Sequence, residues 1–413
     1  MVVEKSAEWG EELWIAALDV EKAFDRVHHT ALFEALLQTG INWGVISSLR
    51  KLYSDMKAYV NLWPGADSRV FNIERGVRQG DPLSPLLFNL VMKNVLGDVL
   101  PVWGRRGYGT NVGSTVRGQR LTHCSFADDM TLIARSWLSM KRMLVMVRDS
   151  LAKFGLTLHP SKCQVQTNLG QEVPRGLTTI EEGFAVEVLP VGIGLVVLGT
   201  VLDLEDPTKL EIENRIAVSW RMFWGMSKLL LNRKISINRR MKVFDSTVAS
   251  CVLWCTESWT PRVEELRKLE GARRSMLRRI LGSKRGSTEE WLDWIQRCTH
   301  KALSLSTRVG GRSWIDMHLQ RKWHWAGHVA RRGLDSWLLR TTSWRDSNWQ
   351  SVVQDLAYRP VRPSRRRWMK WEEALRRYCQ AKGGSPWMQA ARTKEEWNND
   401  AVFFVAWTNA RAS

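Results

Sequence analysis

The chain has 413 residues, 44% of them hydrophobic, and a formal net charge of +19. This length predicts two or three domains with a sizeable core. Because the longest apolar stretch, residues 189–202, is short and interrupted by glycines, the sequence predicts no membrane-spanning helix. Its N-terminus lacks the pattern of a signal peptide. The six cysteines suggest neither a disulfide framework nor a paired Cys-x-x-Cys zinc site, so we expect a reducing compartment.

The positive charge is concentrated in the second half of the chain. Residues 1–200 contain 21 Lys and Arg against 20 Asp and Glu, whereas residues 201–413 contain 40 against 22. Tryptophan is distributed in the same way, with 6 before residue 200 and 17 after it. A basic second half predicts a polyanionic partner, most often nucleic acid. A solvated, arginine-rich helical surface is the alternative, and tryptophan serves cores as readily as base stacking.

The first apolar segment, residues 13–20, is a continuous run of the length of a buried strand. Asp19 lies near its end, and apolar residues at helical spacing follow up to Gly40. The sequence therefore predicts a strand, a turn and a helix. A carboxylate at the exit of a buried strand can be directed at a ligand from a rigid base.

The next segments predict a helix over 44–53, a hairpin from 58–60 and 69–73 around Pro64-Gly65, and a helix over 86–100. Ser84 is a suitable N-cap and Pro85 a suitable first helical residue. In the loop before that helix, glycines such as Gly80 let the backbone approach a ligand closely. Gln79 can donate and accept hydrogen bonds at the same point.

Two short β-prone runs flank Phe126-Ala127-Asp128-Asp129, which is the pattern of a hairpin. Two adjacent carboxylates at a hairpin tip repel each other if they are buried together. A divalent cation relieves that repulsion, and Mg²⁺ prefers a carboxylate or two plus phosphate oxygens. The segment therefore suggests a metal site that handles phosphates, with a solvated Asp-Asp turn as the open alternative.

After this hairpin the sequence predicts a helix over 137–154 and then a strand, a tight turn and a strand over 156–165, with Lys162 at the turn. Residues 168–187 suggest a loop or hairpin, and 195–202 is again β-prone. From about Asp206 onward helical patterning dominates. One amphipathic helix, 263–280, has a basic outer side, and a second basic cluster spans 362–368. Both clusters are candidate phosphate contacts; their residues are Arg273, Arg274, Arg278, Arg365, Arg366 and Arg367.

Three of these segments, 18–25, 78–85 and 126–129, closely resemble, in the same order, the palm motifs of reverse transcriptases from non-LTR retrotransposons. Residues 155–158 with Lys162, and Leu198-Gly199, are similar to that family's next two motifs. Residues 257–260, 277–282 and 325–329 are similar to blocks in the C-terminal regions of these elements. The resemblance covers roughly residues 13–345. It implies an α+β fold: a right-hand polymerase palm of helices and antiparallel sheet, then a mostly α-helical thumb and C-terminal region.

The resemblance implies an RNA-directed DNA polymerase that uses an RNA template, a DNA primer and dNTPs. Asp19 and Asp128 would hold two Mg²⁺ ions (Mn²⁺ could replace them), about 3.5–4 Å apart, with the backbone carbonyl of Val20 as a further ligand. Asp129 would complete the catalytic carboxylates. For the remaining positions, the family's pattern implies that Phe24 excludes a 2′-hydroxyl, that Gln79 and Gly80 pack near the template base and the dNTP, and that Lys162 lies near the triphosphate. Core packing for Phe24 and a solvated turn for Lys162 stay open.

We expect three domains: a palm with truncated fingers over 1–205, a helical thumb-like region over 206–285, and a basic, tryptophan-rich region over 286–413. Only about 18 residues precede Asp19, so the fingers are expected to be missing, and no nuclease motif is apparent. The alternative function is a catalytically inactive, truncated retroelement product that only binds nucleic acid. His324, His328, Cys298 and His300 lack the spacing of a zinc site. We expect no membrane partner, a nuclear or cytoplasmic location, and nuclear access for a retroelement function.

Overall fold

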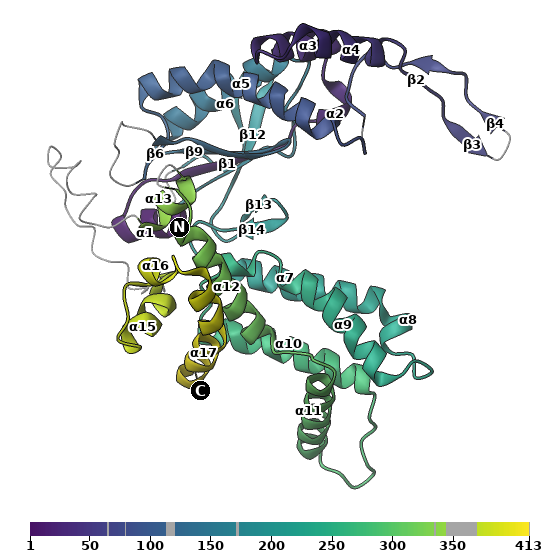
Figure 1. Ribbon diagram of the computed structural model, residues 1–413, viewed down its shortest axis with the longest axis vertical. Helices are drawn as coiled ribbons and strands as arrows, with labels where there is room; N and C mark the ends of the chain where they lie inside the picture. The colour runs from purple at the N-terminus through teal and green to yellow at the C-terminus, as the bar shows by residue number, and fades with distance from the viewer. Residues whose placement is uncertain are drawn as a thin grey trace. The chain divides into compact units, whose positions relative to one another are not determined.

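Figure 1 shows the computed structural model, which describes residues 1–63, 66–78, 80–112, 120–170, 173–333, 336–343 and 370–412. The chain divides into two compact units. One is Glu11–Leu198. The other combines Met1–Gly10 with Gly199–Ser413, so the first ten residues belong with the C-terminal half. The expected division into three domains stays a prediction.

The first unit is built on a six-stranded sheet with the order β11-β12-β10-β1-β9-β8. Its strands are β1 (Trp14–Leu18), β8 (His123–Phe126), β9 (Asp129–Ala134), β10 (Gln164–Thr167), β11 (Gly176–Glu181) and β12 (Phe184–Leu189). Strand β1 lies inside the sheet and pairs antiparallel with both β9 and β10. Four of its five residues are buried, which explains why this strand is continuously apolar rather than alternating. Strand β12 is parallel to β10, and the remaining pairs are antiparallel.

Two long helices, α5 (Ser84–Arg106) and α6 (Trp137–Lys153), pack against each other beside the sheet (Figure 1). The Ser150 hydroxyl donates to the Val95 carbonyl, and Lys153 pairs with Asp98 at 2.7 Å. By length and composition α5 could cross a membrane. However, it buries Leu87, Phe88, Val91, Met92, Val95, Val99 and Trp103 in the core of this unit. That burial identifies α5 as a core helix of the folded unit.

Shorter elements complete the first unit. They are α2 (Ala23–Arg26), α3 (His29–Gln38), α4 (Trp43–Ser54), β2 (Lys57–Ala58), β3 (Asn61–Trp63), β4 (Ala66–Asp67), β5 (Phe71–Asn72), β6 (Thr110–Asn111), β7 (Arg120–Leu121) and β13 (Leu195–Val197). Strands β2 and β5 pair, as do β3 and β4, which confirms the predicted hairpin, although its turn at Pro64-Gly65 lies outside the described residues.

The start of α5 corrects one expectation from the sequence. Leu83 is the N-cap and Ser84 is already helical. The reason is that Asp81 closes the preceding turn: its Oδ1 accepts a hydrogen bond from the Leu83 amide at 2.9 Å. Asp81 therefore orders the turn that leads into the helix, and the N-cap residue Leu83 supplies no side-chain cap.

The second unit is almost entirely helical, as the sequence predicted after residue 206. Its elements are α1 (Val2–Trp9), β14 (Thr200–Leu202), α7 (Lys209–Gly225), α8 (Ser227–Leu230), α9 (Ile237–Val252), η1 (Thr256–Ser258), α10 (Val263–Leu281), α11 (Trp291–Arg308), α12 (Trp314–Ala330), α13 (Trp337–Ser343), α15 (Glu373–Ala381), α16 (Trp387–Ala390) and α17 (Lys394–Ala412). Gly282, at φ 63°, ends α10 as expected.

Tryptophan supplies much of the core of this second unit. Trp314 packs with Phe244 in the cluster formed by α7, α9 and α10. Trp323 and Trp397 stack at 3.7 Å between ring centroids, and each indole N–H donates to the other residue's carbonyl. These rings are buried, so several of the C-terminal tryptophans serve packing and not base stacking.

Candidate active site

The pairing of β1 with β9 brings two distant parts of the sequence together. Leu18 lies opposite Met130 in this antiparallel pair, so the next residues along each strand, Asp19 and Asp129, meet at the same end of the sheet. Asp19 is about one third exposed, and Asp128 is half-buried. Residues separated by more than one hundred positions therefore converge on one acidic edge.

The acidic hairpin is formed by β8 and β9, with Phe126 opposite Asp129 and a two-residue turn between them. Ala127 in this turn has φ 52°, a left-handed conformation that is unfavourable for alanine. Partial burial, followed by the negative charges of Asp128 and Asp19, raises the pKa of Asp129 above its usual value. Strained backbone and crowded carboxylates are both typical of functional sites.

The segment after α6 lies alongside the acidic edge. Val20 forms a bridge with Leu158, and the His159 amide donates to the Asp19 carbonyl at 2.8 Å. The chain then turns, and Lys162 Nζ lies 3.3 Å from Asp19 Oδ2. The predicted strand before the turn is only this single bridge. Lys162 is nevertheless within reach of the carboxylates, where an ammonium offsets part of their repulsion.

Arg26 and Thr157 also position this edge; Thr157 lies in the 155–158 segment that resembles a family motif, but neither residue was predicted to have a role at the site. The Arg26 guanidinium donates to the Thr157 hydroxyl at 2.6 Å and to Glu21 at 2.9 Å. The Glu21 amide donates to the Thr157 carbonyl at 2.9 Å. These bonds attach the backbone that follows Asp19 to the segment before Lys162. The contacts with Thr157 join residues more than 130 positions apart, so they could be identified only if the neighbours of β1 in the sheet were already known.

Besides Val20 and Lys162, two more of the predicted nucleotide-binding residues, Phe24 and Gly80, lie in described parts of the chain. Phe24, half-buried, stacks on Phe88 at 4.8 Å, which is the core contact that was left open. Gly80 has φ 89° and open space where a Cβ would point, as a close backbone approach requires. Gln79 lies outside the described residues. The roles proposed for these three residues stay predictions.

The acidic edge suits a divalent cation by its chemistry. Carboxylate and carbonyl oxygens are hard ligands of the kind that Mg²⁺ takes, and the pKa of Asp129 is raised first by burial and then by the charges of Asp128 and Asp19, which a cation would offset. Among the described residues, however, no three His, Cys, Asp or Glu side chains are grouped as a complete metal site. The histidines considered for zinc have other partners: His324 contacts Asn398, and His328 interacts with Arg332. The edge therefore offers part of a ligand set, with the remainder left to a substrate or water.

The arginines predicted to bind nucleic acid do not share one environment. Arg274 is exposed, and Arg278 is half-buried with its guanidinium donating to the Thr299 hydroxyl at 2.9 Å. Burial lowers the pKa of Arg278. Arg365, Arg366 and Arg367 lie outside the described residues.

Arg273 requires a correction. It is only 3% exposed, because its guanidinium pairs with Glu270 at 2.9 Å and donates to the Ser306 hydroxyl at 3.1 Å. The Glu270 carboxylate in turn accepts from the Ser313 hydroxyl and the Trp314 amide. Arg273 therefore holds α10, α11 and α12 together and is not free to contact a phosphate.

Residues 3–193 match the family model described as reverse transcriptase (RNA-dependent DNA polymerase). The chain is 32% identical over 148 residues to the Pol polyprotein of an R2 retrotransposable element from Popillia japonica, covering 36% of this chain and 20% of that protein. It is 25% identical to a transposon-derived protein of Caenorhabditis elegans, covering 68% of this chain and 95% of that one. A solved telomerase structure from Candida albicans aligns with 71% of this chain and 54% of that chain, at 14% identity and a TM-score of 0.37. The chain thus spans about a fifth of the R2 polyprotein.

Proposed function

We propose, from the premise that residues 3–193 are a reverse transcriptase domain of the non-LTR retrotransposon kind, that this chain is an RNA-directed DNA polymerase. The reaction joins the 3′-hydroxyl of a DNA primer to the α-phosphate of a dNTP and releases pyrophosphate, with RNA as the template. The observation that carries the proposal is the β1–β9 register, which brings Asp19 to the acidic turn.

Asp19 and Asp128, with the Val20 carbonyl, are the groups that would hold two divalent ions, Mg²⁺ or Mn²⁺. Such ions, when bound, lower the pKa of the attacking hydroxyl and stabilise charge on the leaving group. The protein's own contribution is to fix the carboxylates: β1 is clamped between β9 and β10, and Arg26 secures the chain beyond Asp19. Asp129 adds negative charge that favours cation binding at this edge.

Lys162 has a role of its own in this mechanism. Its ammonium lies 3.3 Å from Asp19 and is 60% exposed, so it can exchange this carboxylate for the oxygens of an incoming triphosphate. A lysine in that position can donate a proton from Nζ to the departing pyrophosphate. Phe24, Gln79 and Gly80 complete the proposed nucleotide site, and the exposed Arg274 is the proposed phosphate contact on α10.

Primer extension on poly(rA)/oligo(dT) with dTTP and Mg²⁺ tests the proposal. Asp128→Ala should lower the rate by about a thousandfold or more, since removing a metal ligand forfeits several kcal/mol of transition-state stabilisation. The matched control is Asp149→Ala, which removes an exposed carboxylate of α6 that pairs with Arg148 and should leave extension unchanged.

Absence of incorporation by the unmodified chain, or equal rates for Asp128→Ala and the unmodified chain, would reject the polymerase. Salt-dependent RNA binding that persists without any incorporation would instead support the alternative, a protein that only binds nucleic acid. The excess of basic residues after position 200 is the observation that favours this alternative.

A further inference from the structure

The first unit contains a pocket, apart from the acidic edge, between the last turns of α5, the N-terminal half of α6 and the end of β11. It is lined by Val102, Arg106 and Tyr108 on one side and by Leu138, Lys141 and Arg142 on α6. Its volume, about 480 Å³, is within the range of small-ligand sites. None of the residues that line it belongs to the acidic edge, so the pocket is not part of the carboxylate site.

The pocket is positively charged. Arg106, Lys141 and Arg142 line it, and within the part of the chain that the structure describes no acidic side chain pairs with any of the three. Lys141 Nζ lies 5.9 Å from the centre of the Trp137 ring, which keeps this ammonium near the pocket without neutralising it. The acidic residue in the lining, Glu181, is already paired with Arg148 at 2.9 Å. Three cations with no counter-charge attract an anionic group.

Tyr108 adds a buried polar group that lacks a partner. Its side chain lines the pocket and is 6% exposed, yet its hydroxyl makes no hydrogen bond in the described structure. This hydroxyl is enclosed by the protein, so it is the rest of the Tyr108 side chain that lines the pocket. A phosphate oxygen can accept hydrogen bonds from the three cations.

The rest of the lining is apolar. Val145, Met146 and Ile180 join Val102 and Leu138 in walls that a fully hydrated inorganic ion would not use. A methionine adapts to flat or irregular partners. The combination fits a ligand with a phosphate at one end and a planar, weakly polar body at the other, which is the chemistry of a nucleotide.

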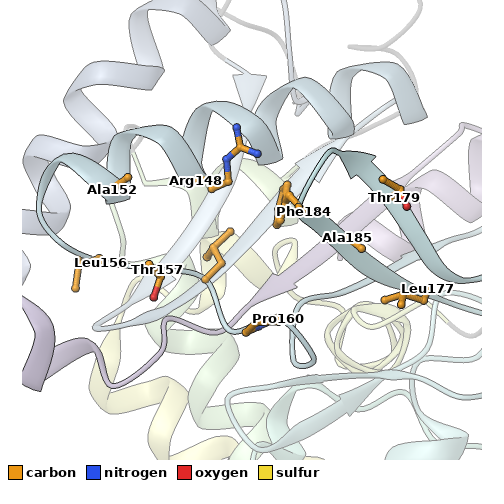
Figure 2. Close-up of a pocket in the computed structure, with 11 residues that line it drawn as sticks. Arg148, Ala152, Leu156, Thr157, Pro160, Leu177, Thr179, Phe184 and Ala185 are labelled. Atoms are coloured by element: carbon orange, nitrogen blue, oxygen red, sulfur yellow. The ribbon is translucent and has the colours of Figure 1, made fainter.

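The neighbouring pocket in Figure 2 provides the contrast. It has a similar volume, about 420 Å³, and Arg148 points into it from α6 beside Phe184. However, Arg148 is bound by Asp149 at 2.7 Å and by Glu181 at 2.9 Å, and its guanidinium lies 5.2 Å from the Phe184 ring. That cation is fully engaged within the protein. The pocket described first, here called the Tyr108 pocket, therefore differs in having cations that are not paired with a carboxylate in the described structure.

We propose that the Tyr108 pocket binds one nucleotide unit through its phosphate, with Arg106, Lys141 and Arg142 on the anion and the base against Met146 and Ile180. The unit is either a free nucleotide or one residue of a single strand. This second site is independent of polymerase activity, because it shares no residue with the acidic edge.

Photocrosslinking of the full chain tests this site, with 4-thiouridine-labelled oligouridine RNA and, separately, 4-thiouridine monophosphate as probes. Crosslinks mapped by mass spectrometry should fall on peptides containing Tyr108 or Met146. Arg106→Ala should reduce them about tenfold, since one charge-assisted hydrogen bond to phosphate is lost. The matched control is Arg105→Ala, which removes an exposed positive charge from the same turn but outside the lining and should leave the yield unchanged.

The two probes distinguish the source of the nucleotide. Labelling by both identifies a free-nucleotide site, and labelling by the RNA alone identifies a single-strand contact. The proposal is overturned if crosslinks avoid these peptides, if Arg105→Ala and Arg106→Ala lose equal yield, or if inorganic phosphate competes as well as uridine monophosphate. Asp128→Ala should keep the crosslinks while losing extension, so failure of this site and failure of the polymerase are separate results.

Discussion

The two units of this protein use charged residues in opposite ways. In Glu11–Leu198, the carboxylates of the acidic edge are held at a partly exposed end of the sheet, and among the residues that the structure describes Lys162 is the one cation paired with them. In the unit that contains Gly199–Ser413, much of the charge is enclosed. Arg273 and Glu270 pair out of contact with water, as do Arg215 and Glu211, and Lys322 is 5% exposed.

The difference teaches that exposed and enclosed charges have different consequences. The carboxylates of the acidic edge repel one another and Lys162 offsets only part of that repulsion, which is an arrangement that a bound cation would stabilise. The enclosed pairs of the helical unit position helices, and removing one partner leaves a buried charge uncompensated. A high count of basic residues is therefore not by itself a measure of nucleic-acid binding surface, although the exposed arginines of α10 are available for it.

The largest effect is expected for Arg273→Ala, which should destabilise the helical unit by about 3–5 kcal/mol because Glu270 remains buried without its cation. Urea unfolding followed by tryptophan fluorescence measures it. The double variant Glu270→Gln/Arg273→Met should recover much of the loss, because no unpaired charge is left. A loss below about 0.5 kcal/mol for Arg273→Ala would mean that the arginine is a surface residue, as the sequence had suggested.

A pH dependence of the helical unit sharpens the comparison. His318 is 1% exposed, and its Nδ1 lies 3.0 Å from the Thr256 carbonyl. Burial, and next the charge of Lys322, lower the pKa of His318 from 6.5 to about 3. Between these values the unfolded chain binds a proton that the folded chain does not. The His318 contribution to the free energy of unfolding is therefore complete above pH 6.5. It falls as the pH decreases below that value, by about 1.4 kcal/mol per pH unit.

Chemical unfolding at a series of pH values between neutral and mildly acidic measures that slope. His318→Asn keeps a hydrogen-bond donor near the Thr256 carbonyl but cannot titrate, so its slope should be smaller by about one proton. Identical slopes in the two proteins would show that the imidazole is not buried in its neutral form.

The smallest effect is expected for Arg274→Ala. This arginine is exposed on α10, so its loss should not change the unfolding free energy by more than about 0.5 kcal/mol. It should reduce the slope of log affinity against log salt for an RNA–DNA duplex by about one. Arg376→Ala is the control, because that exposed arginine is paired with Glu373 at 2.9 Å. Equal salt slopes for Arg274→Ala and the unmodified chain would remove α10 from the proposed nucleic-acid surface.

The sequence predicted the elements of the first unit well because strand and turn signals are local. The apolar run ending at Asp19 and the short runs around Asp128 and Asp129 became β1, β8 and β9. Ser84 was misassigned because Asp81 orders the preceding turn through a geometry that composition does not reveal.

Contacts between residues far apart in the sequence could not be predicted from these local signals. The bonds from Arg26 to Thr157 depend on which strand pairs with which. Arg273 was misplaced for a different reason: it is next to the exposed Arg274 in the sequence, and the packing of α11 and α12 against α10 encloses it. Arg273 lies four residues from both Leu269 and Leu277, on the apolar side of α10, so the spacing was a local signal that separates it from Arg274.

The central claim, that Asp19 and Asp128 converge on shared divalent cations, can be tested directly by iron-mediated backbone cleavage. Fe²⁺ with ascorbate and peroxide cuts the chain close to where the metal binds. The account predicts two cuts, one near residue 19 and one near residue 128, both suppressed by excess Mg²⁺ and both lost in Asp128→Ala. A cut at only one of these positions, or a cut near residue 19 that persists in Asp128→Ala, would contradict it.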